Sequence, residues 1–281
     1  MKALVCLFLV CGSTAALCET ATPLATDWVE GFNNKARLLA GHATPAGEQK
    51  GTFAGIEIAM PEGWKTYWRV PGDAGGVPPE FDWSGSENLA SAEVLYPAPH
   101  RSTDKAGDSV GYKNRVLFPV RLTAKDETKP IVVKSRIDYG VCKDICIPAE
   151  AKLELEIPNA LGNSPDLDEA LAKVPVGKPR AGVDPALETW RLDKASGKPK
   201  LVLTVASAST KDVDVFVAAP GGAYLPLPQR TDAKDANGAN VEFNVDLSDG
   251  VDLDALNGNP LTVTMVDSKG QSETTIKLDT K

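Results

Sequence analysis

Two runs of alternating apolar and polar residues mirror each other about Asp144, and this symmetry constrains the fold more than any other feature of the chain. Apolar residues take the odd positions both in residues 131–139 and in residues 153–157. When the chain is folded about Asp144, both runs point their apolar side chains to one face, as half-buried antiparallel strands do. The pattern therefore predicts a β-hairpin whose register pairs Ile131 with Ile157, Val133 with Leu155, and Ile137 with Ala151.

Cys142 and Cys146 lie on the two sides of the predicted turn, with three residues between them. In this register they are directly opposed, and opposed residues have Cα atoms about 4.5–5.5 Å apart, which is within the range for a disulfide. Both cysteines share the parity of the polar residues Asp138 and Glu150. We therefore expect the sulfur atoms on the outer face of the hairpin, where another protein can reach them.

A disulfide across so short a loop adds little stability. The chain-entropy estimate is about 2 kcal/mol for roughly five residues, against about 4.7 kcal/mol for a loop of about a hundred. A cross-link that serves stability alone gains more by joining distant strands, so the spacing favours redox chemistry. A structural disulfide remains the alternative, because secreted proteins also carry short-loop disulfides.

The N-terminus has the pattern of a secretory signal peptide, which we place at residues 1–18. Lys2 precedes a short apolar core and then small residues, with cleavage after Ala16 or Cys18. Leu17 stands where a lipoprotein signal needs a small residue, so we do not expect Cys18 to be lipidated. Removal through Cys18 leaves the pair at 142 and 146 in an oxidising compartment, where a disulfide persists.

Charge and histidine content exclude several classes of function. The formal net charge is −8, without basic clusters, which argues against nucleic acid as a partner. The two histidines, His42 and His100, lack the spacing of metal ligands. We therefore expect no cofactor and no resident metal, and with two histidines no serine hydrolase arrangement stands out.

Short alternating runs separated by Gly, Pro and Asn-rich turns predict an all-β fold of two antiparallel β-sandwich domains. Residues 28–40 fit a strand and a helix equally well. The polar stretch 97–112 reads as a long surface loop. The clearer strands of the first half are 52–60, 64–70, 78–83, 91–96 and 116–122.

One helix and one linker separate the two halves. Ser164 can cap a helix with Pro165 in its first turn, and the periodicity continues to Val174. A Gly and Pro-rich run follows, and alternating strands resume near Leu187. We therefore expect a redox β-sandwich at 19–163, a helix and linker at 164–185, and a second sandwich at 186–281 that is structural or binds partners.

Several motifs occur together in the first half: Gly55-Ile56-Glu57, Gly63-Trp64-Lys65-Thr66-Tyr67-Trp68-Arg69, Pro71-Gly72-Asp73, Tyr96-Pro97-Ala98-Pro99, Gly111-Tyr112 and the Cys142/Cys146 element. In this combination, residues 27–160 resemble the N-terminal periplasmic (alpha) domain of the DsbD/ScsB thiol:disulfide interchange proteins. The second half resembles, more weakly, the extra β-domain of the ScsB-like members.

The resemblance implies that the sandwiches are immunoglobulin-like and that the first carries a redox cysteine pair on a hairpin, shielded by a cap loop until a partner docks. By motif order the cap matches residues 97–112, so the resemblance places Tyr67, His100, Tyr112 and Tyr139 in or around it. It further implies periplasmic thioredoxin-fold partners and electron delivery to isomerases, peroxide defence or cytochrome c biogenesis. The chain carries no further apolar span and no Cys-x-x-Cys domain, so we expect a separate membrane protein to donate the electrons.

The function predicted from these features is thiol:disulfide exchange in the periplasm through Cys142 and Cys146, as a component of a protein-disulfide reductase system. Acidic neighbours disfavour a thiolate, and Lys143 is the one cation next to the pair in sequence, so we expect a poor nucleophile that reacts inside a docked complex. By analogy with the family, Cys146 is attacked first. Two alternatives stay open: a Cu(I)-handling protein, because paired thiolates suit a soft ion, and a non-catalytic adaptor with a structural disulfide.

Overall fold

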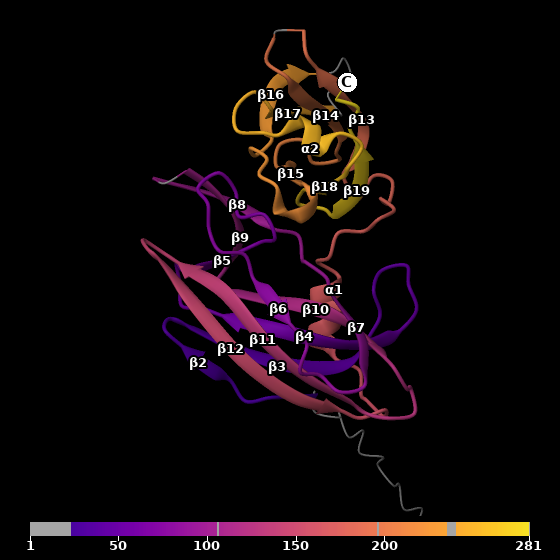
Figure 1. Ribbon diagram of the computed structural model, residues 1–281. Coiled ribbons are helices and arrows are strands. Elements are labelled where there is room, and N and C mark those ends of the chain that lie inside the picture. The colour runs from indigo at the N-terminus through magenta and orange to yellow at the C-terminus, as the bar shows by residue number, and fades with distance from the viewer. Residues whose placement is uncertain (1–23, 106, 196, 235–239, 281) are drawn as a thin grey trace, which may run out of the picture.

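The computed structural model describes residues 24–105, 107–195, 197–234 and 240–280. The predicted signal peptide and Cys18 lie outside these residues. Over the described part of the chain, the strands form four sheets in two pairs, and all named strand pairings are antiparallel. We refer to β1 to β12 with α1 as the N-terminal unit and to β13 to β19 as the C-terminal unit; Figure 1 shows the second above the first.

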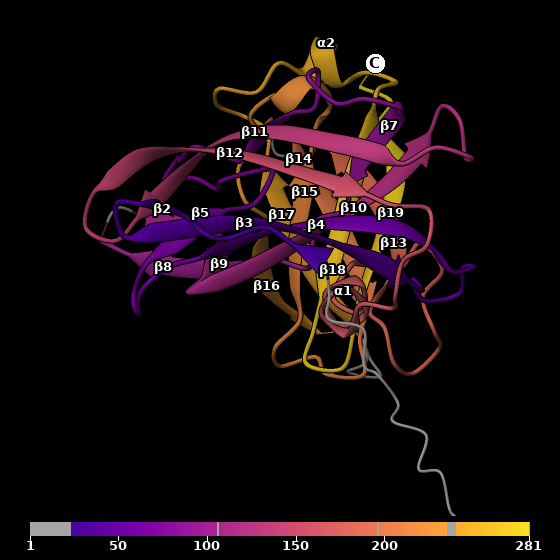
Figure 2. The same cartoon turned by 90° about the horizontal axis from the view of Figure 1, so that it is seen from below.

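Two sheets build the N-terminal unit. The first contains, in spatial order, β1 (Leu24–Ala25), β3 (Asn34–Ala43), β4 (Gly51–Ala59), β10 (Arg115–Ala124) and β7 (Leu89–Val94), with β2 (Val29–Gly31) beside β3. The second contains β12 (Cys146–Ile157), β11 (Ile131–Cys142), β5 (Lys65–Tyr67), β9 (Gly107–Lys113) and β8 (His100–Asp104), with β6 (Glu80–Asp82) beside β11. Figure 2 shows β3 and β4 in one layer and β11 and β12 in the other.

The core of the N-terminal unit lies between these two sheets. Ile56 and Ile58 of one sheet and Val133 and Ile137 of the other are fully buried in a single apolar cluster. The opposite face of β4 is buried as well, because α1 (Pro165–Leu171) packs Leu167 against it. This double burial explains why β4 is apolar or small along most of its length.

The structure resolves or corrects three predictions for this unit. Residues 28–40 form strands β2 and β3, so the strand alternative is right there. The predicted strand 64–70 is shorter, because β5 ends at Tyr67 and Trp68 turns into the core. The stretch 97–112 is not a loop: it contains the hairpin of β8 and β9. Most of its side chains are polar and bond to one another and to neighbouring segments, so only Val110 and Tyr112 of β9 enter the core cluster from these two strands.

The C-terminal unit repeats the two-sheet design on a smaller scale. One sheet is β13 (Ala186–Asp193), β14 (Lys200–Ala206), β17 (Asn240–Asp246) and β16 (Gln229–Lys234); the other is β15 (Asp214–Ala218), β18 (Pro260–Val266) and β19 (Gln271–Lys277). A short helix α2 (Leu253–Leu256) and a 3₁₀ turn (Pro220–Gly222) connect strands. Its core is a separate apolar cluster that includes Leu203, Phe243 and Val263.

The helix between the units begins as predicted. The Ser164 side chain accepts a hydrogen bond from the Leu167 amide, and Pro165 occupies the first turn. The helix ends at Leu171, and the segment that follows is irregular. Within the described residues, no helix has both the length and the apolar character needed to cross a membrane.

An apolar contact joins the two units. The Trp68 ring is 1% exposed, and its centroid lies 5.7 Å from that of Phe216 on β15. Phe216 and Leu227 both belong to the core cluster of the N-terminal unit. The first core therefore extends across the boundary, which the sequence pattern alone did not predict.

Candidate functional site

The hairpin of β11 and β12 presents the two cysteines at its tip. The strands pair without a shift from Ile131 opposite Ile157 to Cys142 opposite Cys146, which confirms the predicted register. Cys142 and Cys146 form a disulfide, with Cα atoms 4.2 Å apart. This separation is somewhat shorter than the about 4.5–5.5 Å expected for opposed strand residues.

The turn between the cysteines is exposed. The Lys143 amide donates a hydrogen bond to the Ile145 carbonyl (3.2 Å), and the three turn residues avoid positive φ, so the turn needs no glycine. Ile145 is 69% exposed. An aliphatic side chain held in solvent next to a disulfide offers an apolar contact to a visiting protein.

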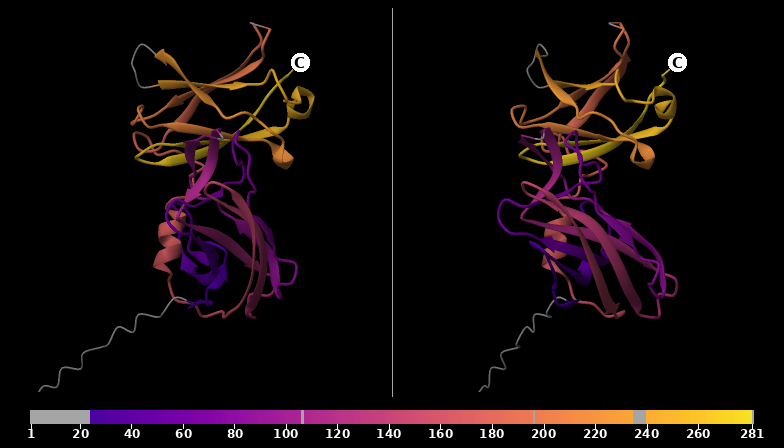
Figure 3. Two further views of the ribbon diagram at one scale, coloured as in Figure 1. Left: turned by 90° about the vertical axis from the view of Figure 1, so that its left-hand side faces the viewer. Right: turned by 60° about the vertical axis from the view of Figure 1, so that its left-hand side comes forward.

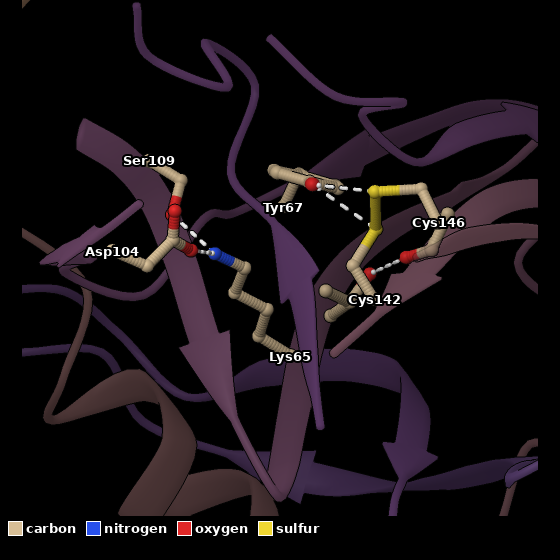
Figure 4. The surroundings of a disulfide bond; sticks show 8 residues. Lys65, Tyr67, Asp104, Ser109, Cys142 and Cys146 are labelled. Carbon is tan, nitrogen blue, oxygen red and sulfur yellow. Dashed lines mark hydrogen bonds and ion pairs between the residues drawn. A yellow bond between two sulfur atoms is a disulfide. The ribbon is translucent and has the colours of Figure 1, made fainter. Parts of the chain in front are cut away.

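The two cysteine residues differ in exposure, which corrects the expectation that both are reachable. Cys146 is exposed, whereas Cys142 is 1% exposed. Cys142 does lie on the predicted face, but residues from earlier in the chain cover that face at the tip. The Tyr67 side chain lies over the pair, as Figure 4 shows.

Tyr67 contacts both halves of the disulfide. Its hydroxyl lies 3.0 Å from the Sγ of Cys142 and 3.0 Å from the Sγ of Cys146. Neither sulfur of a disulfide carries a hydrogen, so the tyrosine is the donor and shares one hydrogen between them. Burial raises the pKa of Tyr67, and the charge of Asp104 raises it further, so the hydroxyl stays protonated at neutral pH.

A glycine and a backbone segment hold the Tyr67 ring in place. Gly76 has a φ of 152°, and a Cβ there would lie 2.3 Å from the Tyr67 ring, so no larger residue fits without moving the ring. The next carbonyl, of Val77, accepts a hydrogen bond from the Gly140 amide (3.0 Å). Residues 71–79 therefore form one wall over the disulfide.

The tip of the hairpin of β8 and β9 forms the other wall. Lys65 Nζ lies 2.9 Å from Asp104 Oδ2 and 2.7 Å from Ser109 Oγ, as Figure 4 shows. A cavity of about 440 Å³ lies between these residues and the disulfide. Sequence reasoning missed Lys65, although its i, i+2 spacing from Tyr67 on a strand places both side chains on one face.

The charges around the pair differ from the expectation. The acidic neighbours Asp138 and Glu150 are both paired with Arg136, at 2.8 and 3.1 Å. Glu150 also pairs with Lys152 (3.2 Å), so two cations face the two carboxylates. Lys143 is not the one cation nearby, because β5 pairs with β11 and brings Lys65 opposite Cys142. The disulfide therefore lies in a mixed rather than an acidic field.

The other residues predicted around the cap have different surroundings. The Tyr112 hydroxyl donates to the Pro97 carbonyl (2.8 Å), and burial raises its pKa. The Tyr139 hydroxyl donates to Asn34 Oδ1 (2.6 Å), and burial raises the pKa of Tyr139 to about 12. His100 is exposed at the start of β8. A role at the disulfide for these three residues stays a prediction.

No group of three or more His, Cys, Asp and Glu side chains that could hold a metal ion occurs among the described residues. A Cu(I) site at the tip would therefore have the two cysteine sulfurs as its ligands, and it would require their disulfide to be reduced first.

Comparisons with known proteins agree with this geometry. Residues 35–158 match the family model described as the N-terminal domain of the thiol:disulfide interchange protein DsbD. Among solved structures, the chain is similar to the N-terminal periplasmic domain of ScsB from Proteus mirabilis, with a TM-score of 0.66 and 19% sequence identity. That alignment covers 92% of this chain and 99% of the ScsB domain, and at this identity it shows a shared fold alone.

No curated protein sequence matches the chain. The matched residues include the whole disulfide-bearing hairpin with both cysteines, and also Tyr67 of β5. Residues 35–158 of this chain are therefore similar to the DsbD N-terminal domains that this family model describes.

Proposed function

We propose that this chain is a periplasmic thiol:disulfide exchange protein that relays electrons between a thioredoxin-like donor and periplasmic acceptors through Cys142 and Cys146. The observation that carries the proposal is the asymmetry of the pair. Cys146 is exposed at the hairpin tip, whereas Cys142 is 1% exposed. The Tyr67 hydroxyl lies 3.0 Å from both sulfurs. A disulfide that serves stability alone needs neither feature.

The exchange step follows from this asymmetry. A partner thiolate attacks the Sγ of Cys146, a partner–Cys146 bond forms, the Cys142–Cys146 bond breaks, and Cys142 leaves as a thiolate. The partner's second thiolate then attacks the partner sulfur that is bonded to Cys146, and Cys146 leaves as a thiolate. The partner dithiol is thereby oxidised to a disulfide, and the pair gains two electrons and two protons.

Tyr67 favours the departure of Cys142. Its hydroxyl already lies 3.0 Å from that sulfur, and a hydrogen bond to a charged acceptor is stronger than one to a neutral acceptor. The raised pKa of Tyr67 keeps the proton on the hydroxyl in the pH range of the periplasm. The donor therefore stabilises negative charge where it develops and does so without rearrangement.

The wider assignments rest on the family and on the sequence. The match to the DsbD family model supports thioredoxin-fold partners, and the similar ScsB domain is periplasmic. We place the chain in the periplasm, exported by the signal peptide at 1–18, with a separate membrane protein as donor and cytochrome c biogenesis among the pathways it could supply. The paired sheets of each unit fit two immunoglobulin-like domains at 19–163 and 186–281, joined by 164–185.

Single-cysteine variants test the proposal. Both Cys142→Ser and Cys146→Ser should lose two-electron oxidation of reduced thioredoxin by about a hundredfold or more, because each removes one half of the couple. The thiol that remains should differ between them. In Cys142→Ser the exposed Cys146 should form a mixed disulfide with a disulfide-activated thioredoxin-fold protein at least about tenfold faster than the buried Cys142 does in Cys146→Ser.

The reduction potential of the wild-type pair decides against the structural alternative. We expect a value above about −300 mV in equilibrium with glutathione, since structural disulfides in secreted proteins lie lower. A lower value, together with no exchange with any thioredoxin-fold protein, would identify the disulfide as a structural cross-link. Equal trapping by the two single-cysteine variants would contradict the assignment of Cys146 as the attacked sulfur.

A further inference from the structure

The hairpin of β8 and β9 contacts the C-terminal unit at its base and the disulfide cavity at its tip. Figures 1 and 3 show it rising from the N-terminal unit to lie beside the C-terminal unit. At the base, Arg101 of β8 donates two hydrogen bonds to the Asp214 carboxylate, at 3.0 and 2.8 Å, and a third to the Pro228 carbonyl at 2.8 Å. Its guanidinium also lies 5.9 Å from the centre of the Phe216 ring.

This arginine joins the C-terminal unit to both strands of the hairpin. A further nitrogen of Arg101 donates to Asp108 Oδ2 on β9 (3.2 Å), and the Arg101 side chain is 17% exposed. Burial lowers the pKa of Arg101, but its bonds to Asp214 and Asp108 outweigh that effect and raise it. A bidentate guanidinium–carboxylate pair fixes orientation as well as distance. The base of the hairpin is therefore held at a defined position against β15.

The contacts continue from Asp108 to the cavity. The Asp108 carboxylate accepts a hydrogen bond from the Thr103 hydroxyl (2.6 Å), and the Asp108 carbonyl accepts one from the Ala74 amide (2.9 Å). The next residue, Ser109, accepts a hydrogen bond from Lys65 at the edge of the cavity. The position of Asp108 thus influences both the hairpin wall and residues 71–79.

A second contact reaches residues 71–79 directly. Asp73 Oδ1 accepts a hydrogen bond from the Leu227 amide (3.0 Å) and a longer one from the Tyr224 hydroxyl (3.4 Å), both in the C-terminal unit. Three residues after Asp73, Gly76 lies against the Tyr67 ring. The C-terminal unit therefore contacts both segments that wall the disulfide.

We infer that Arg101 and Asp73 are positioning residues through which the C-terminal unit fixes the two walls over the Cys142–Cys146 disulfide and so sets how fast a thiol reaches it. The inference deepens the proposed function and rests on it for its physiological meaning. It gives the C-terminal unit a role although that unit contributes no atom to the cavity around the disulfide. Releasing either contact lets a wall move away from the sulfurs.

The test uses the full-length chain and dithiothreitol as the reductant. Reduction of the Cys142–Cys146 disulfide should be about threefold to tenfold faster in Arg101→Gln and in Asp214→Asn than in the wild-type protein, a range typical of such coupling. In Asp73→Asn the increase should be somewhat smaller. The double variant Arg101→Gln/Asp214→Asn should be no faster than the faster single variant, because both changes break the same contact. The equilibrium of the pair with glutathione should change by less than about twofold, since no contact to sulfur is altered.

Glu273→Gln is the matched control. Glu273 pairs with Arg69 across the same two units, but neither residue belongs to the hairpin or to residues 71–79. The rate at which dithiothreitol reduces the disulfide of Glu273→Gln should stay within about twofold of the wild-type rate. Hydrogen exchange of the Ala74 and Gly140 amides gives a second readout, and it should speed up in Arg101→Gln and Asp73→Asn but not in Glu273→Gln.

Reduction rates in Arg101→Gln and Asp214→Asn that match the control would overturn the inference, even if the urea midpoints of those variants fall. If Arg101→Gln does not fold, Asp214→Asn, which preserves side-chain shape, carries the test. Because dithiothreitol replaces any physiological partner, this failure is distinct from failure of the proposed function, which is read from the reduction potential and from exchange with thioredoxin.

Discussion

The N-terminal and C-terminal units use the same construction, and they differ in how far their strands extend. Both bury alternate side chains between two antiparallel sheets. β11 and β12 are 12 residues long, whereas β14 and β17 at the centre of the second unit have 7 each. The longer hairpin carries its turn beyond the packed core, where side chains are free to do chemistry. A β-sandwich can therefore present a functional site where its strands extend beyond the packed core.

The largest expected effect tests whether the C-terminal unit supports the site from a distance. Phe243 is buried in the core of the C-terminal unit, so Phe243→Ala should lower the free energy of unfolding of that unit by about 3–5 kcal/mol. In conditions where the N-terminal unit stays folded, reduction of the disulfide by dithiothreitol should become faster. Urea unfolding followed by circular dichroism and a parallel reduction assay measure both effects.

Phe53→Ala is the control for that prediction. Phe53 is equally buried, but it packs beneath α1 on the far face of β4. The substitution should cost a similar free energy without accelerating reduction of the native disulfide. Equal acceleration by both variants would mean that general loosening, rather than the C-terminal unit, controls access.

A smaller effect is expected at the tyrosine. Tyr67→Phe keeps the ring against Gly76 but removes the hydrogen bond to the sulfurs, so it should slow exchange with thioredoxin by about tenfold to a hundredfold, since a bond to a charged acceptor contributes about 1.5–3 kcal/mol. The unfolding midpoint of the oxidised protein should change less, because no apolar contact is lost and the disulfide sulfurs are neutral acceptors. Stopped-flow fluorescence measures the rate. An unchanged rate would remove Tyr67 from the mechanism and leave the hairpin tip as the whole site.

The smallest effect is a pH dependence at the base of the hairpin. The Thr103 hydroxyl and, after it, Arg101 lower the pKa of Asp108 below its ordinary value of 3.8. A lowered pKa means that the contribution of Asp108 is fully present above the ordinary value and is lost as pH falls through the lowered one. A phosphine remains active in acid and can reduce the disulfide at each pH. The ratio of the wild-type rate to the Asp108→Asn rate should therefore stay constant until pH falls below about 4.

Below that point, the wild-type rate should rise towards that of Asp108→Asn, by less than about threefold. The variant also separates Asp108 from its acidic neighbours Asp104 and Asp214, which both proteins retain. A ratio that stays flat through the acid range would show that Asp108 does not help to hold the wall.

The sequence predicts the hairpin well because its information is local. The mirrored alternation about Asp144 determines the register of β11 and β12, and Ser164 followed by Pro165 determines where α1 begins. Such signals lie within a few residues of the feature they specify. They therefore do not depend on how distant segments pack.

The burial of Cys142 could not be predicted in this way. Its cover comes from Tyr67, 75 residues earlier in the chain, and periodicity carries no information about that contact. The hairpin of β8 and β9 was missed for a related reason. Polar pairs such as Lys65 with Asp104 and Arg101 with Asp108 hold it, and Val110 and Tyr112 alone are too short an apolar pattern to predict a strand.

The shared core around Trp68 has a practical consequence for anyone who excises the disulfide-bearing half as a minimal fragment. Removing the C-terminal half takes Phe216 and Leu227 out of that core and bares an indole face that is 1% exposed in the whole chain. An uncovered aromatic surface of this kind promotes self-association. Kinetic constants measured on such a fragment would then describe self-associated molecules in which the segments over the disulfide are no longer held, rather than the whole chain.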